Sequence, residues 1–126
     1  LIYLPKEPLN EAKLEGVDNV ETVWADLERP GGLRIPVSSV DLTLLLNILG
    51  LVKGKETLLN EATRVTKNGG TLIISDWKNG HAPLGPPPEK RLDRENVKLL
   101  AKNAGFEFIR EFEAGKYHFG MVFKKP

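Results

Sequence analysis

The sequence predicts a three-layer α/β domain with a Rossmann-like, mostly parallel sheet and an antiparallel hairpin at its C-terminal end. Strand-like apolar runs alternate with amphipathic helical stretches as far as Glu113. Two strand-like segments then follow each other with only Ala114-Gly115 between them, which is the spacing of a tight antiparallel hairpin. With 126 residues, 40% of them hydrophobic, the chain has the size of one domain spanning residues 1–126.

A βαβ unit occupies the middle of the sequence. Residues 40–48 are too continuously apolar for a half-exposed strand, so we expect a strand buried on both faces. Residues 55–67 have helical spacing, with polar residues such as Glu61 and Arg64 around an apolar stripe of Leu58, Leu59, Ala62 and Val65. Asn68-Gly69-Gly70 is typical of a helix end that takes left-handed backbone, and residues 71–77 form the second strand.

Shorter elements precede this unit. We expect a strand over residues 1–4, a helix over 9–15, a strand over 20–25 and a loop over 28–36. Because the sequence enters a strand-like run at once, we interpret it as a piece of a longer parent protein.

The C-terminal part contains a loop, a helix and the hairpin. Residues 78–89 lack periodicity and contain four prolines, and Asp93 is suited to begin a helix that runs to about Asn103. Strands are predicted over 106–113 and 116–124, and alternation in the second puts His118 opposite the apolar face. With residues 1–4 placed beside 40–47, we expect six strands in the order 2-1-3-4-6-5.

Composition excludes several function classes. The net charge is +1, from 18 basic and 17 acidic residues, and no basic block is interleaved with aromatics, so nucleic acid is not the expected partner. No apolar run is long enough to cross a membrane, and there are no cysteines, which is compatible with a reducing compartment. We therefore expect a soluble, cytoplasmic protein.

Four stretches in this order resemble the class I S-adenosylmethionine-dependent methyltransferases, in particular the type 11 group that acts on small molecules. They are residues 24–27 (Trp-Ala-Asp-Leu), 39–47, 58–70 with its Arg-Val-Thr-Lys-Asn-Gly-Gly ending, and 104–106 (Ala-Gly-Phe). The resemblance covers the chain from about Val20 onwards. It implies S-adenosylmethionine as cofactor and a small-molecule methyl acceptor.

The resemblance assigns cofactor-binding roles to three residues. It implies that the Asp26 carboxylate accepts from the adenine amino group with the backbone of Leu27 beside it, and that Asn47 faces the methyl-bearing sulfonium and the acceptor. Alternatively, Asp26 caps the loop toward Pro30 and Asn47 hydrogen-bonds to nearby backbone. We expect the three residues to cluster at the C-terminal edge of the sheet, under a partial lid formed by residues 78–89.

Trp77 and His81 are the candidate substrate-binding residues. Trp77 ends a strand at the edge where open α/β sheets bind ligands, so it would either stack on a ligand or plug the end of the sheet. His81 would be a general base or a solvated loop residue. His118 is not expected to be catalytic, no residue spacing supports a metal site, and the catalytic residues are not identified.

The sequence departs from the family before Val20, where the glycine-rich cofactor turn is missing and Gly16 cannot replace it. We therefore expect weak S-adenosylmethionine binding, and an exposed sheet edge through which the chain would self-associate. Three hypotheses follow: a methyltransferase, a methyltransferase-like interaction module that does not catalyse, and an unrelated nucleotide-binding domain. The sequence contains no Gly-x-Gly-x-x-Gly or phosphate-loop lysine motif, which disfavours the third hypothesis.

Overall fold

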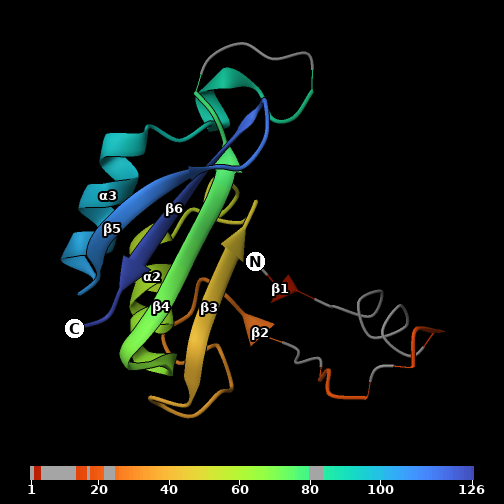
Figure 1. Cartoon of the computed structure of the whole chain (residues 1–126), viewed down its shortest axis with the longest axis vertical. Coiled ribbons are helices and arrows are strands. Elements are labelled where there is room, and N and C mark those ends of the chain that lie inside the picture. The colour runs from red at the N-terminus through yellow and green to blue at the C-terminus, as the bar shows by residue number, and fades with distance from the viewer. Residues whose placement is uncertain (1, 4–13, 17, 22–24, 80–83) are drawn as a thin grey trace.

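The computed structural model describes residues 2–3, 14–16, 18–21, 25–79 and 84–126. Most of the helix predicted over 9–15, and residues 22–24 of the strand predicted over 20–25, lie outside these ranges. The described elements, shown in Figure 1, are β1 (Ile2–Tyr3), β2 (Ala25–Asp26), β3 (Val40–Leu46), α2 (Lys55–Val65), β4 (Thr66–Trp77), the 3-10 helix η1 (Pro88–Lys90), α3 (Arg94–Asn103), β5 (Glu107–Glu113) and β6 (His118–Lys124).

Four strands form the main sheet in the order β3-β4-β6-β5. The parallel β3–β4 pair with its crossover helix confirms the predicted βαβ unit, and the antiparallel β5–β6 pair confirms the hairpin. β4 and β6 are also antiparallel, so β6 is the strand that runs against both of its neighbours.

The predicted position of the first strand is wrong. β1 pairs antiparallel with β2 in a separate two-stranded sheet and does not join β3. Among the described strands β3 is therefore at the edge of its sheet, and Leu42, Leu44 and Leu46 are 49%, 49% and 50% exposed instead of buried. A strand is buried on both faces only when neighbours and covering layers surround it, and within the described part of the chain β3 has a neighbour on one side.

Helices α2 and α3 pack on the same face of the main sheet (Figure 1). Their apolar stripes and the inward side chains of the strands form one core, which includes Leu58, Leu59, Ala62, Val97, Ala101, Leu72, Ile74, Met121 and Phe123. His118 alternates with this face, as predicted. Two layers of the expected three are thus described. No helix among the described residues is long and apolar enough to cross a bilayer.

Residues outside α2 satisfy both of its ends. Gly54 offers no side-chain cap, and the Glu28 carboxylate accepts from the Lys53 and Gly54 amides at 2.5 and 3.1 Å instead. At the other end Lys125 Nζ donates to the carbonyl of Thr66 at 2.8 Å. Strand β4 begins at Thr66, earlier than predicted, because backbone hydrogen bonds with Lys125 extend it over Gly69 and Gly70.

Candidate functional site

Asp26 ends β2 and lines a polar cavity of about 440 Å³ with Arg29, Arg34 and the backbone of Gly31 and Gly32. Its Oδ1 accepts from the Glu28 amide at 3.0 Å, the contact expected of a loop-capping carboxylate. Only glycine fits at position 32, because an added Cβ would lie 1.9 Å from the Asp26 carbonyl oxygen. The loop is therefore folded tightly against the backbone of Asp26.

An ion pair on α2 between the buried Glu61 and the partly exposed Arg64 holds this loop in place. Glu61 is 4% exposed and accepts from the Gly31 amide at 2.8 Å and from Arg64 Nη2 at 2.9 Å. Arg64 in turn donates to the carbonyls of Leu33 and Ile35 at 2.6 and 2.8 Å. The hydrogen bond from the guanidinium, assisted by those from the loop amides, lowers the pKa of the Glu61 carboxyl against the opposing effect of burial.

Asn47 follows β3 with a positive φ of 57° and an exposed side chain, and its N–H donates to the Ser75 carbonyl at 2.8 Å. The next turn is held by Asp76, a 3% exposed carboxylate to which sequence reasoning gave no role. Asp76 Oδ2 accepts from the Gly50 amide at 3.0 Å and its Oδ1 from the Trp77 amide at 2.8 Å. The ends of β3 and β4 are thereby fixed relative to each other.

Trp77 is partly buried and contacts protein groups on several sides. Its ring centroid lies 4.2 Å from that of His118, and the Arg91 guanidinium carbon lies 5.4 Å from the ring centroid. A Cβ at Gly85 would come within 2.7 Å of the indole. These neighbours favour the interpretation of Trp77 as a residue that closes the end of the sheet, and its stacking on a ligand stays a prediction.

The loop after β4 lies at the C-terminal end of that strand, which is the predicted edge (Figure 1). Arg91 fastens its described part by donating to the carbonyls of Leu84, at 2.7 Å, and Pro86, at 2.9 Å. His81 lies outside the described residues. A lid over Asp26 and Asn47 therefore stays a prediction.

Leu27 directly follows Asp26 in the sequence but lines a different depression of the surface. It is 7% exposed and lines an apolar groove of about 280 Å³ along β3, to which Ile48 also contributes directly after Asn47. The structure thus brings Leu27 close to the residues that follow β3. Asp26 lines the separate polar cavity, so its clustering with Asn47 stays a prediction.

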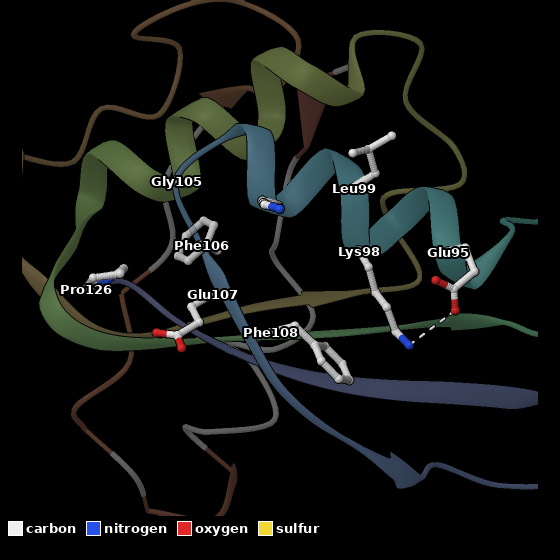
Figure 2. Close-up of a pocket in the computed structure, with 9 residues that line it drawn as sticks. Glu95, Lys98, Leu99, Gly105, Phe106, Glu107, Phe108 and Pro126 are labelled. Atoms are coloured by element: carbon white, nitrogen blue, oxygen red, sulfur yellow. Dashed lines mark hydrogen bonds and ion pairs between the residues drawn. The ribbon is translucent and has the colours of Figure 1, made fainter.

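A larger cavity of about 710 Å³ lies elsewhere, between α3 and β5 (Figure 2). Leu99, Phe106 and Phe108 give it an apolar lining, with two lysines and two glutamates around them. Lys98 Nζ is already 3.4 Å from both Glu95 and Glu111 carboxylates. The charges balance, so the cavity shows no preference for a charged ligand. Among the described residues no group of three or more side chains is arranged to hold a metal ion.

A family model for a methyltransferase domain matches residues 3–74, more than half of the chain. The chain belongs to the type 11 methyltransferases. S-adenosylmethionine is the cofactor that this family membership assigns. No curated protein matches the chain.

Solved structures agree with this methyltransferase assignment. An S-adenosylmethionine-dependent methyltransferase from Aquifex aeolicus is 28% identical, with a TM-score of 0.83 over 94% of this chain and 61% of its own. A protein described as a type 11 methyltransferase from Sulfolobus solfataricus is 30% identical, with a TM-score of 0.74 over 98% and 68%. The chain thus spans less than two thirds of the Aquifex protein. The [4+2]-cyclase SpnF, 14% identical with a TM-score of 0.76, shares the fold alone.

The described residues of this methyltransferase-family chain fit the cofactor in part. Asp26 supplies a carboxylate to a polar cavity, which is the kind of acceptor that an adenine amino group requires. The groove along β3 is lined by apolar side chains, and its one hydroxyl, on Thr43, is already hydrogen-bonded to Thr66 at 2.7 Å. The amino and carboxylate groups of the cofactor's methionine part would find no charged partner in that groove.

Proposed function

We propose that this chain is the adenine-binding and acceptor-binding part of an S-adenosylmethionine-dependent methyltransferase of a small-molecule acceptor. The observation that carries the proposal is the position of Asp26 and Leu27, side by side at the end of β2, within a chain that belongs to the methyltransferases. The absence of a basic block in the sequence favours a small acceptor over nucleic acid. A sequence without cysteines supports a cytoplasmic location.

Asp26 would accept a hydrogen bond from the adenine amino group, and the Leu27 backbone would lie against the ring. The Glu61–Arg64 pair keeps the loop that carries Gly31 at the wall of this cavity. Asn47 would contact the acceptor at the end of β3. The bound cofactor supplies an activated methyl group, so the protein contributes chiefly by aligning the acceptor and excluding water.

We further propose that cofactor affinity is impaired in this chain. Polar groups that leave water must gain hydrogen-bond partners, or their desolvation costs binding free energy. The apolar groove along β3 supports this proposal, because it offers the methionine part no charged side chain.

Titration with S-adenosylhomocysteine tests both proposals. Calorimetry should give a dissociation constant well above micromolar, whereas millimolar ligand should shift the amide NMR signals of Leu27 and Asn47. A micromolar constant would contradict impaired affinity. An unchanged spectrum at millimolar ligand would contradict binding at this site.

Asp26→Ala should weaken the binding of S-adenosylhomocysteine by about 1–3 kcal/mol, the cost of losing one partner of a buried polar group. Asp41→Ala is the matched control, because Asp41 is an exposed carboxylate near the beginning of β3, where it pairs with Lys67. If the two variants bound S-adenosylhomocysteine with equal affinity, Asp26 would not be part of the binding site.

A non-catalytic interaction module is the second candidate function. The observation in its favour is the row of half-exposed leucines on the edge strand β3. This candidate becomes the better one if S-adenosylhomocysteine shifts no amide signal, even after upstream sequence of a longer parent is joined to the chain.

A further inference from the structure

The polar cavity beside Asp26 has more basic than acidic residues around it. Arg29 and Arg34 line this cavity of about 440 Å³, and Asp26 is the acid among its described lining residues. Both arginines are exposed, and neither guanidinium makes a hydrogen bond or an ion pair with another residue in the described part of the chain. The cavity therefore offers a ligand two cationic donors and one carboxylate acceptor.

Two nearby acids do not neutralise these arginines, because other groups hold the acids. The Glu28 carboxylate accepts from the two backbone amides that precede α2. The Glu61 carboxylate accepts from Arg64 and from the Gly31 amide. Neither of these acids is among the described residues that line the cavity. We therefore expect a positive potential at the two arginines, which favours a ligand with negative charge at that end.

The backbone that carries both arginines is fixed by hydrogen bonds. The Arg29 carbonyl accepts from the Gly32 amide at 2.8 Å. Arg34 lies between two residues whose carbonyls both accept from Arg64, at 2.6 and 2.8 Å. Because the loop is already ordered, only the two long side chains lose freedom when they hold an anion. The entropic cost of binding an anion here is smaller than it would be on a loose loop.

We propose that the cavity takes an adenine nucleotide, with its base at Asp26 and a phosphate held by Arg29 and Arg34. The Asp26 carboxylate would accept from the adenine amino group as it does for the cofactor in the proposed function, on which this inference rests. A guanidinium donates two parallel hydrogen bonds to a phosphate, and two guanidiniums balance the charge of a phosphate dianion. S-adenosylmethionine has no phosphate, so a free adenine nucleotide would engage donors that the cofactor does not use. The nucleotide would thus compete with the cofactor and inhibit methyl transfer.

Two simpler anions are distinguished from the nucleotide by the test. Inorganic phosphate would meet the arginines without a base, and the carboxylate of the cofactor's methionine part would meet them without a phosphate. The cavity volume of about 440 Å³ lies within the range of small-molecule sites, roughly 300–1,000 Å³. This volume favours a ligand that is larger than phosphate alone.

Three ligands separate the contributions of the base and of the phosphate. Adenosine, adenosine monophosphate and inorganic phosphate are each titrated into the ¹⁵N-labelled chain, and the amide NMR signals of Leu27, Gly31 and Gly32 report binding. Adenosine monophosphate should bind at least about tenfold more tightly than either other ligand, because it alone engages Asp26 and the arginines together. Added salt should weaken the binding of adenosine monophosphate and leave that of adenosine almost unchanged, because salt screens exposed charges.

Variants of the arginines locate the phosphate. Arg29→Gln and Arg34→Gln should each weaken the binding of adenosine monophosphate at least about fivefold and leave that of adenosine unchanged, because each removes one charged donor. Both side chains are exposed, so the variants should fold. Arg110→Gln is the matched control, because Arg110 is an exposed arginine on β5 that does not line the cavity. It should bind both ligands as the unaltered chain does.

Competition connects the nucleotide with the cofactor site. Adenosine monophosphate should raise the apparent dissociation constant of S-adenosylhomocysteine as its own concentration rises. The two arginine variants should bind S-adenosylhomocysteine as the unaltered chain does, because that ligand has no phosphate. If they bound it more weakly, the arginines would hold the carboxylate of the cofactor, and the proposal would be wrong.

Two further outcomes would overturn the proposal. One is that adenosine monophosphate binds no more tightly than adenosine, and the other is that inorganic phosphate binds as tightly as the nucleotide. The failure of this inference differs from a failure of the proposed function. Absent binding of both adenosine and S-adenosylhomocysteine would contradict the proposed function, whereas equal affinities of adenosine and adenosine monophosphate would contradict the nucleotide proposal alone.

Discussion

Glu61 and Arg64 show how one residue pair decides the shape of the candidate site. The two side chains together make hydrogen bonds to four backbone groups of the loop after β2, at Gly31, Leu33 and Ile35. A buried ion pair adds little stability compared with well-packed apolar residues, but removal of one partner leaves the other charge uncompensated. The pair therefore fixes the loop more than it stabilises the fold.

Glu61→Gln should destabilise the protein at neutral pH by about 1–3 kcal/mol, the cost of weakening charge-assisted hydrogen bonds to a buried group. Because the folded-state pKa of Glu61 lies below its usual 4.5, its stabilising effect is complete above that value. The effect is lost as the pH falls through the lowered pKa. Urea unfolding of both proteins between pH 7 and pH 3 measures this.

The gap in unfolding free energy between wild type and Glu61→Gln should therefore shrink as the pH decreases. Glu56→Gln is the matched control, because Glu56 is an exposed acid on the same helix. A gap that is constant across the pH range would mean that the Glu61 charge does not stabilise the folded state.

The sequence predicted the position of Asp26 at a strand end, because a β-branched run followed by a carboxylate and a glycine-rich loop is a local signal. It did not predict the burial of Glu61. An acid and a base three residues apart on the polar side of a helix usually form a solvated pair. The burial of Glu61 involves the loop at Gly31, and that contact joins residues 30 positions apart.

The β5–β6 hairpin depends on close packing of an aromatic ring against glycine. A Cβ at Gly120 would lie 2.4 Å from the Phe112 ring, directly across the strand pair. Gly120→Ala should therefore destabilise the protein by about 1–3 kcal/mol, the usual cost of overpacking. Chemical denaturation of the single variants Gly120→Ala and Phe112→Leu and of the double variant measures this.

In that double-mutant cycle, Phe112→Leu should relieve most of the cost of Gly120→Ala. Additive effects of the two changes would show that the ring contact is not the cause.

Elements with strong local signals were predicted correctly, and elements defined by distant contacts were not. The β3–α2–β4 unit and the hairpin are confirmed, because periodicity and short connections encode them. The position of β1 was wrong, since a strand of two residues makes few hydrogen bonds and its sequence does not specify a neighbour. The prediction that β3 is buried was wrong for a similar reason. Whether a strand is buried depends on which strand lies beside it, and the sequence of β3 does not specify that neighbour.

At the scale of the whole molecule, the two sheets differ in how firmly they are held. β4 and β6 each have neighbours on both sides and contribute Leu72, Ile74, Met121 and Phe123 to the core. β1 and β2 pair over two residues each. The stability of the small sheet should therefore be lower than that of the main sheet.

Native-state hydrogen exchange should show this difference. The amides of residues 72–75 and 119–123 should exchange only by global unfolding, whereas those of β1 and β2 should exchange at least roughly a hundredfold faster through local opening. Low denaturant should accelerate the first group and leave the second almost unchanged. The same denaturant dependence in both groups would contradict separate stabilities.

The insertion of β6 between β4 and β5 has a consequence for how sequence length can vary. The β4–β6 seam pairs residues 71–77 with 118–124 through seven registered positions, and the Lys78 amide adds one backbone hydrogen bond to the Tyr117 carbonyl at 2.7 Å. Closing a longer loop costs only about 0.6 kcal/mol for each doubling of its length. Insertions in the loop that follows Lys78 can therefore accumulate without disturbing the strand register, whereas a one-residue slip in the pairing of β6 would shift every side chain of β6 to the opposite face.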